Sequence, residues 1–462
     1  MFTIGEIVDC CAGVLVKGDT EARISAVSID SRTIRPGELF LAIKGSRCNG
    51  HEYIPAVIER KPAGIVVCRE WFDNNREKLD NVCVPLIVAE DTVIALGDIA
   101  AAHRKKFDIP VIAVTGSNGK TTTKEIIATV LGLQYNVLKN EGSLNNHIGV
   151  PLTLLKLNSS HTAAVLELGM NHKGEIRSLA ALVRPTIAVI TNAAEAHLEF
   201  FNGVGDIIDA KCELLENLPY GAHAVVNADY PRLYAKAQEY AEDVIGFGIE
   251  KNCRYRASNV ISQDDGVVFT LNEKYAFKLP LLGEHNAYNA LAAIAVADFL
   301  GIAMETMREC LARFQPVSLR METVNCNGVR IIADCYNANP HSMAAAIRTL
   351  TAVANTARKI VVFGDMRELG AASVEQHCHI GQLIAGQGIA FLLTVGKDAA
   401  YAAKAAADSG MDKKNIFVFS QTDEASQCLA GLVQPGDVVL LKASRAMKME
   451  QVLKHIVDKS EG

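Results

Sequence analysis

The sequence predicts an α/β protein with mostly parallel sheets, divided into three domains. Its 462 residues exceed what one core usually supports, so two or three domains of about 100–200 residues are expected. From residue 111 onward, short β-branched apolar runs alternate with helical patterns, which is typical of parallel strands covered by helices on both faces. We therefore expect a small α/β domain at 1–88, a central P-loop-type domain at 89–316, and a Rossmann-like domain at 317–462.

The N-terminal domain has few strong signals. Alternating apolar residues at 38–43 predict a strand after a Pro-Gly turn, and the apolar run 64–67 predicts a second strand. A polar cluster precedes the turn, and composition alone favours a solvated loop for it. The cluster consists of Ser28, Asp30, Ser31 and Arg32. A helix at 92–106, which ends in basic residues, leads into the central domain.

The stretch 111–125, VIAVTGSNGKTTTKE, predicts a phosphate-binding loop between a buried strand and a helix that begins at Lys120. Glycines in such a turn let backbone N–H groups and the helix N-terminus converge on a phosphate. Lys120 would add a cation and Thr121 a hydroxyl for Mg²⁺. Val114 stands where the strict GxxxxGK[ST] pattern requires glycine, so the loop is a shortened variant. The residues of this predicted site are Thr115, Gly116, Ser117, Asn118, Gly119, Lys120, Thr121 and Thr122.

Two further strands of the central domain are followed by polar residues. Strand 163–168 carries Glu167 near its carboxyl end, where a carboxylate requires a partner such as Mg²⁺ beside a phosphate, or a salt bridge. His197 follows strand 186–191 and is interpreted as either a structural histidine or a ligand. Lys211, in a helix expected at 206–217, is a surface lysine when it is considered alone.

The end of the central domain and the C-terminal domain repeat this pattern. An apolar helix expected within 281–301 carries Asn286 and Asn289 near its start, where they could bind an adenine edge or cap the helix. Arg320 lies in the predicted hinge and could reach a phosphate. Beyond it, Asp334 ends a strand at 329–334. The other expected elements are strands 359–364, 390–395 and 438–442, and helices 341–353 and 374–385.

Composition excludes several classes of protein. Net charge is −6 without a basic stripe, which argues against a nucleic-acid-binding surface. The N-terminus is not basic like a signal peptide, and no apolar run reaches the roughly 18 residues of a membrane span. Twelve cysteines without a CxxC pair fit neither a zinc site nor a disulfide framework. We expect a cytoplasmic protein with reduced thiols, and nothing in the sequence demands more than a monomer.

Eight motifs together resemble those of the Mur ligase family, the ATP-dependent amide-forming enzymes of bacterial cell-wall synthesis. They occur in the family's order through all three predicted domains. They are TGSNGKTTTKE (115–125), NNHIGVPLTLL (145–155), LELGM (166–170), TNAAEAHLEFF (191–201), AKCELLEN (210–217), GEHNAYNALAA (283–293), Arg320 and DCYNANPHSM (334–343).

The resemblance implies a role for each candidate residue. It implies catalytic roles for Lys120, Lys211, His197 and Arg320. One Mg²⁺ would lie near Thr121 and Glu167, and a second near His197 and Lys211, with Lys211 carbamylated by CO₂. ATP would also contact Asn286, Asn289, Arg320 and Asp334. Ser28, Asp30, Ser31 and Arg32 would hold a UDP-sugar, and Tyr336, Asn337 and Asn339 would face the incoming amine.

Within the family, the YNANP stretch at 336–340 and the GDMRELG stretch at 364–370 favour one activity. It joins D-alanyl-D-alanine to UDP-N-acetylmuramoyl-tripeptide through an acyl phosphate, with release of ADP and phosphate. A ligase that adds the third residue and a folylpolyglutamate synthase are the enzymatic alternatives. A nucleotide-binding switch, whose ATP turnover would not depend on a peptide carboxylate, is the alternative from another class.

Overall fold

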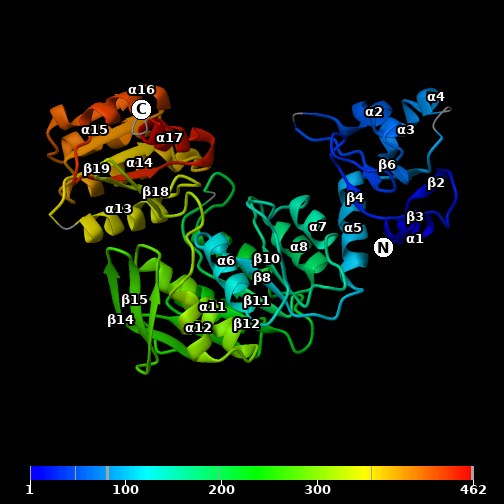
Figure 1. The fold of residues 1–462 in the computed structure, drawn as a ribbon, viewed down its shortest axis with the longest axis horizontal. Helices are drawn as coiled ribbons and strands as arrows, with labels where there is room; N and C mark the ends of the chain where they lie inside the picture. Colours follow the sequence, from blue (N-terminus) through cyan, green and yellow to red (C-terminus); the bar gives the residue numbers. More distant parts are fainter. Residues whose placement is uncertain (1, 47, 80–82, 197, 355, 459–462) are drawn as a thin grey trace.

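The computed structural model describes residues 2–46, 48–79, 83–196, 198–354 and 356–458. The chain forms three sheet-centred units, arranged with the N-terminal unit (blue) and the C-terminal unit (yellow to red) on opposite sides of the central one (Figure 1). The predicted α/β class with mostly parallel sheets is confirmed. Within the described ranges, no helix is long and apolar enough to cross a membrane.

The N-terminal unit contains a five-stranded sheet in the order β2-β7-β6-β5-β4. Only β2 is antiparallel to its neighbour. The strands are β2 (Val14–Lys17), β4 (Val27–Ser28), β5 (Leu39–Leu41), β6 (Gly64–Cys68) and β7 (Leu86–Ala89), with β1 (Phe2–Thr3) and β3 (Arg23–Ile24) paired separately. The helices are α1 (Ile4–Cys10), α2 (Ile54–Glu59), α3 (Arg69–Asp73) and α4 (Arg76–Leu79). Helix α5 (Thr92–Arg104) then leads to the central unit (Figure 1).

The central unit is built on a nine-stranded sheet in the order β16-β15-β14-β13-β12-β11-β8-β10-β9. Strands β9 to β14 run parallel, and β15 and β16 extend the sheet as an antiparallel edge. The strands are β8 (Val111–Thr115), β9 (Val137–Lys139), β10 (Ala163–Glu167), β11 (Ile187–Ile190), β12 (His223–Asn227), β13 (Val244–Gly248), β14 (Tyr255–Gln263), β15 (Gly266–Leu271) and β16 (Tyr275–Leu279).

Helices cover both faces of this sheet because its central strands are apolar on both sides. Along β8, Val111 and Ala113 pack in one core cluster, while Ile112 and Val114 pack in the other. The helices are α6 (Lys120–Leu131), α7 (Gly149–Leu154), α8 (Glu175–Val183), α9 (Val204–Cys212), α10 (Pro231–Gln238), α11 (His285–Phe299) and α12 (Met304–Leu311). The helix predicted at 206–217 is thus shorter than expected.

The C-terminal unit has six strands in the order β17-β18-β22-β19-β20-β21, and only the edge strand β17 is antiparallel. The strands are β17 (Glu322–Cys326), β18 (Val329–Ala333), β19 (Lys359–Gly364), β20 (Phe391–Val395), β21 (Ile416–Phe419) and β22 (Val438–Lys442). The helices are α13 (Pro340–Ala354), α14 (Ser373–Ala385), α15 (Ala399–Asp408), α16 (Thr422–Leu432) and α17 (Glu450–Asp458). Because β18 and β22 are neighbours, the residues that follow them meet at one sheet edge.

Candidate active site

The loop between β8 and α6 lies where the strand order of the central sheet changes direction, the usual ligand position in such sheets. Gly116 and Gly119 have positive φ angles of 153° and 81°. A Cβ on Gly116 would lie 1.9 Å from the Thr191 hydroxyl, and one on Gly119 would lie 2.4 Å from the Asn289 amide oxygen. Only glycine fits at these two positions, and the loop leaves the N-terminus of α6 open to an anion.

Lys120 lies inside this loop. Its ammonium donates to the carbonyls of Gly116 and Ser117 at 2.8 and 3.3 Å. Burial lowers the pKa of the Lys120 ammonium, and the nearby Glu167 carboxylate opposes that shift. A cation held against two carbonyls beside an open helix N-terminus can turn toward a phosphate.

Glu167, at the end of β10, is 3% exposed and is held by two neutral donors. Its carboxylate accepts from the Thr121 hydroxyl at 2.8 Å and from the Asn145 amide at 2.7 Å. The Asn140 side-chain amide donates to the Glu167 carbonyl, and its oxygen accepts from the Glu167 N–H. Among the described residues, no group of three or more His, Cys, Asp and Glu side chains could hold a metal alone. One carboxylate with one hydroxyl fits Mg²⁺, which keeps water and phosphate ligands.

Lys211 is buried in α9 with 1% of its surface exposed, so the prediction of a surface lysine is wrong. The acidic residues near it in sequence have other partners: Glu213 accepts from the backbone of Gly174 and Arg177, and Glu216 pairs with Arg177. Within the described ranges, no hydrogen bond or ion pair reaches the Lys211 amine. Burial, together with the positive charge of Lys120, brings its pKa well below the usual value. A neutral amine is the form that can react with CO₂. His197 lies outside the described residues.

The two asparagines of α11 are buried and bonded to each other. The Thr123 hydroxyl donates to Asn289 at 3.1 Å, Asn289 donates to Asn286 at 2.8 Å, and Asn286 donates to the Leu282 carbonyl at 2.8 Å. Asn286 lies inside the helix and does not cap it. Neighbouring His285 has its pKa lowered to about 4 by burial. These hydrogen bonds between side chains therefore connect α6, the helix that follows the phosphate loop, to the α11 wall of the cavity.

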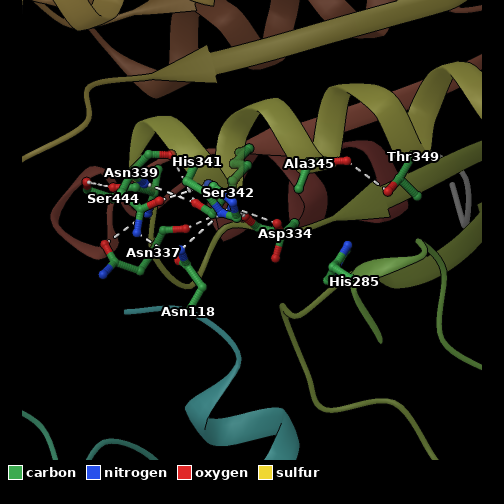
Figure 2. A network of polar contacts seen from close by, with 12 residues as sticks. Asn118, His285, Asp334, Asn337, Asn339, His341, Ser342, Ala345, Thr349 and Ser444 are labelled. Carbon is green, nitrogen blue, oxygen red and sulfur yellow. Dashed lines mark hydrogen bonds and ion pairs between the residues drawn. The ribbon is translucent and has the colours of Figure 1, made fainter. Parts of the chain in front are cut away.

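The C-terminal unit supplies the opposite wall. Asp334, just after β18, accepts from the Lys442 ammonium at the end of β22 at 2.6 Å. The Arg320 guanidinium stacks over the Tyr336 ring at 3.9 Å and donates to Thr121 at 3.1 Å. Figure 2 shows this region from close by: Asp334 of the C-terminal unit and His285 of α11 both lie below α13.

These walls enclose a cavity of about 1020 Å³. The structure brings to it Lys120, Thr121, Glu167, Asn286, Asn289, Arg320, Asp334, Tyr336, Asn337 and Asn339. Ser28, Asp30, Ser31 and Arg32 lie instead in the N-terminal unit and are not among its lining. In that unit the Arg32 guanidinium donates two hydrogen bonds to the Asp30 carboxylate, at 2.9 and 2.7 Å. These bonds, together with one from the Arg32 backbone N–H, lower the pKa of Asp30 to about 2.

Sequence reasoning missed four residues that hold the site together. Asn140 and Asn145 position Glu167, and Lys442 positions Asp334. Lys124, fully buried in α6, donates to the Asn140 carbonyl at 2.6 Å. Asn145 lies in the NNHIGVP motif and Lys442 ends a predicted strand, so the sequence contained a reason to include each of them in the site. Lys124 lies in the TGSNGKTTTKE motif, but nothing in the motif shows that its side chain is buried.

Comparisons with known proteins agree with this geometry. The Mur ligase catalytic-domain model matches residues 23–104, the middle-domain model 114–297, and the glutamate ligase domain model 319–445. The chain is 34% identical over 459 residues to UDP-N-acetylmuramoyl-tripeptide--D-alanyl-D-alanine ligase of Bacillus subtilis, covering 99% of this chain and 98% of the relative.

Two solved structures are similar over nearly the whole chain. MurF from Acinetobacter baumannii has a TM-score of 0.89 at 30% identity and covers 99% of both chains. MurF ligase from Thermotoga maritima, solved in complex with ADP, has a TM-score of 0.84 at 28% identity, with 95% of this chain and 98% of that one covered. These matches confirm the predicted three-domain fold.

Proposed function

This chain belongs to the Mur ligase family, and from that premise we propose that it joins D-alanyl-D-alanine to UDP-N-acetylmuramoyl-tripeptide with consumption of ATP. The observation that carries the proposal is 34% identity over 99% of the chain with a relative named for that reaction. The cavity between the phosphate loop and the C-terminal wall supports it, because it has room for a nucleotide and a second substrate.

The reaction proceeds in two steps. A carboxylate oxygen of the tripeptide bonds to the γ-phosphorus of ATP, the bond to the bridging oxygen breaks, and ADP leaves. The amine of the dipeptide then bonds to the carbonyl carbon, inorganic phosphate leaves, and one proton is released. Lys120, Arg320 and the N-terminus of α6 offset the repulsion between the two anions in the first step.

Mg²⁺ fits this site and would screen the phosphate charge. Thr121 and Glu167 would hold one ion, since the hydroxyl and the carboxylate lie together on the cavity wall. His197 and Lys211 would hold a second, with Lys211 as its carbamate. Support for the carbamate comes from the burial of Lys211 and the low pKa of its amine, because a neutral amine is required to attack CO₂.

The remaining candidate residues divide between the substrates. Asn286, Asn289 and Asp334 would face the nucleotide. The exposed cluster from Ser28 to Arg32 would hold the UDP-sugar, and the segment that contains Tyr336, Asn337 and Asn339 would lie on the dipeptide side. We propose that the reaction takes place in the cytoplasm. One chain supplies every proposed substrate-binding segment, which supports a monomer.

The test is phosphate release from ATP and Mg²⁺ with UDP-N-acetylmuramoyl-tripeptide, measured with and without D-alanyl-D-alanine and followed by mass analysis of the product. The proposal expects release only when both substrates are present, with formation of the pentapeptide. Equal release with a single amino acid in place of the dipeptide would overturn it in favour of another ligase activity. Release without any acceptor would favour a nucleotide-driven switch.

A further inference from the structure

Asn118, in the phosphate loop, has its backbone held by the central unit. Its N–H donates to the Asn192 amide oxygen at 2.9 Å. Its carbonyl accepts from the Thr191 hydroxyl at 2.6 Å and from the Asn192 amide at 3.0 Å. Three hydrogen bonds from one short segment leave the Asn118 backbone little freedom, so the direction of its Cα–Cβ bond is fixed.

That side chain points to the C-terminal unit, away from the loop (Figure 2). The Asn339 amide donates to the Asn118 oxygen at 2.8 Å, and the Asn118 amide nitrogen lies 3.4 Å from Nδ1 of His341. These contacts join residues more than 200 positions apart, and they connect the phosphate loop directly to the start of α13.

Asn339 is equally constrained from its own side. It is 9% exposed, and its amide oxygen accepts from the Ser342 N–H at 2.8 Å, which caps the first turn of α13. Its own N–H donates to the Ser342 hydroxyl at 3.1 Å. The cap fixes the amide oxygen, and the amide nitrogen, which lies in the same plane on the other side of the Cβ–Cγ bond, is thereby directed at Asn118.

We propose that the Asn118–Asn339 hydrogen bond is an interdomain latch that couples the shape of the phosphate loop to docking of the C-terminal unit. Asn339 is then a positioning residue that acts through Asn118, and its side chain is engaged with the loop instead of the dipeptide. This proposal rests on the proposed function. It adds that the hydrogen bond positions the phosphate loop relative to the cavity wall of the C-terminal unit for amide formation.

The variant Asn339→Ser separates the latch from the helix cap. A serine hydroxyl still accepts from the Ser342 N–H as a helix cap, but it is too short to reach the Asn118 oxygen. We expect kcat to fall about 10-fold with KM for the UDP-linked substrate unchanged. The matched control, Ser342→Ala, removes hydrogen bonds of the cap without touching Asn118 and should stay within about twofold of the parent.

Two further measurements decide the outcome. In a double-mutant cycle, Asn118→Ala and Asn339→Ala should be non-additive, so that the double variant is about as slow as the slower single variant. Hydrogen exchange of the intact protein should show faster exchange in the phosphate loop of Asn339→Ser, as well as in α13. This readout needs no turnover, so it distinguishes failure of the latch from failure of the proposed function. Additive effects, or altered exchange confined to the C-terminal unit, would overturn the latch.

Discussion

The ion pair between Lys442 and Asp334 supports the most quantitative prediction. Lys442 is 1% exposed, and its ammonium donates to the Asp334 carboxylate at 2.6 Å, to the Asn337 carbonyl at 3.0 Å and to the Asp334 carbonyl at 3.4 Å. The perturbation is Lys442→Met, which keeps most of the length and the apolar stem of the side chain while removing the charge and all three hydrogen bonds.

The expected cost follows from what the substitution leaves behind. Removing one partner of a buried ion pair costs about 3–5 kcal/mol, because the other charge loses its compensation. The Asp334 side chain is 14% exposed, so water relieves part of that penalty. We therefore expect the free energy of unfolding of the C-terminal unit to fall by about 3 kcal/mol, the low end of the range. Since Asp334 and Asn337 both line the cavity, activity should fall as well.

The assay is hydrogen exchange of the β22 amides in the intact protein at increasing urea, which reports the unfolding free energy of that unit alone. The matched control is the double variant Lys442→Met with Asp334→Asn. It removes the uncompensated carboxylate and should recover a large part of the lost stability. A loss below about 1 kcal/mol in Lys442→Met, or a double variant no more stable than the single one, would refute the reasoning.

Three further predictions concern single side chains. Lys211→Ala should lower turnover by about 10²-fold or more, with partial recovery in added acetate or formate; full activity without them contradicts the carbamate. Lys120→Ala should reduce turnover by about 10³-fold while calorimetry shows unchanged binding of the UDP-linked substrate, and a change confined to that binding contradicts its phosphate role. His51, 2% exposed, accepts from the Cys68 N–H, and burial lowers its pKa to about 4. The unfolded chain therefore binds the proton first as pH falls from about 6.5 to 4, so stability should drop by up to about 3 kcal/mol in that window. Urea unfolding at each pH should show a flatter dependence in His51→Gln, and an equal slope in both proteins contradicts the assignment.

The parts of the fold predicted from the sequence are those in which local pattern and tertiary role coincide. The central strands are apolar on both faces, so the runs 163–168 and 186–191 were recognisable without knowledge of their neighbours. The loop glycines were recognisable from the GSNGKT pattern alone, although the side chains that exclude a Cβ at Gly116 and Gly119 are the distant Thr191 and Asn289. The Ala-rich helix α15 has no strong periodicity of large apolar residues, and edge strand β21 is only partly buried, so neither was predicted.

Lysines show where local pattern ceases to be informative. Lys124, Lys211 and Lys442 are each at most 1% exposed, yet each lies in a segment whose charged residues are typical of a surface. Two of them have polar partners: Lys124 contacts the Asn140 carbonyl and the adjacent Glu125 carboxylate, and Lys442 contacts the distant Asp334. Lys211 is the exception, since no described residue bonds its amine. A buried lysine without a partner is stable only as the neutral amine or after modification. This requirement supports the carbamate proposal more strongly than the place of Lys211 in the AKCELLEN motif does.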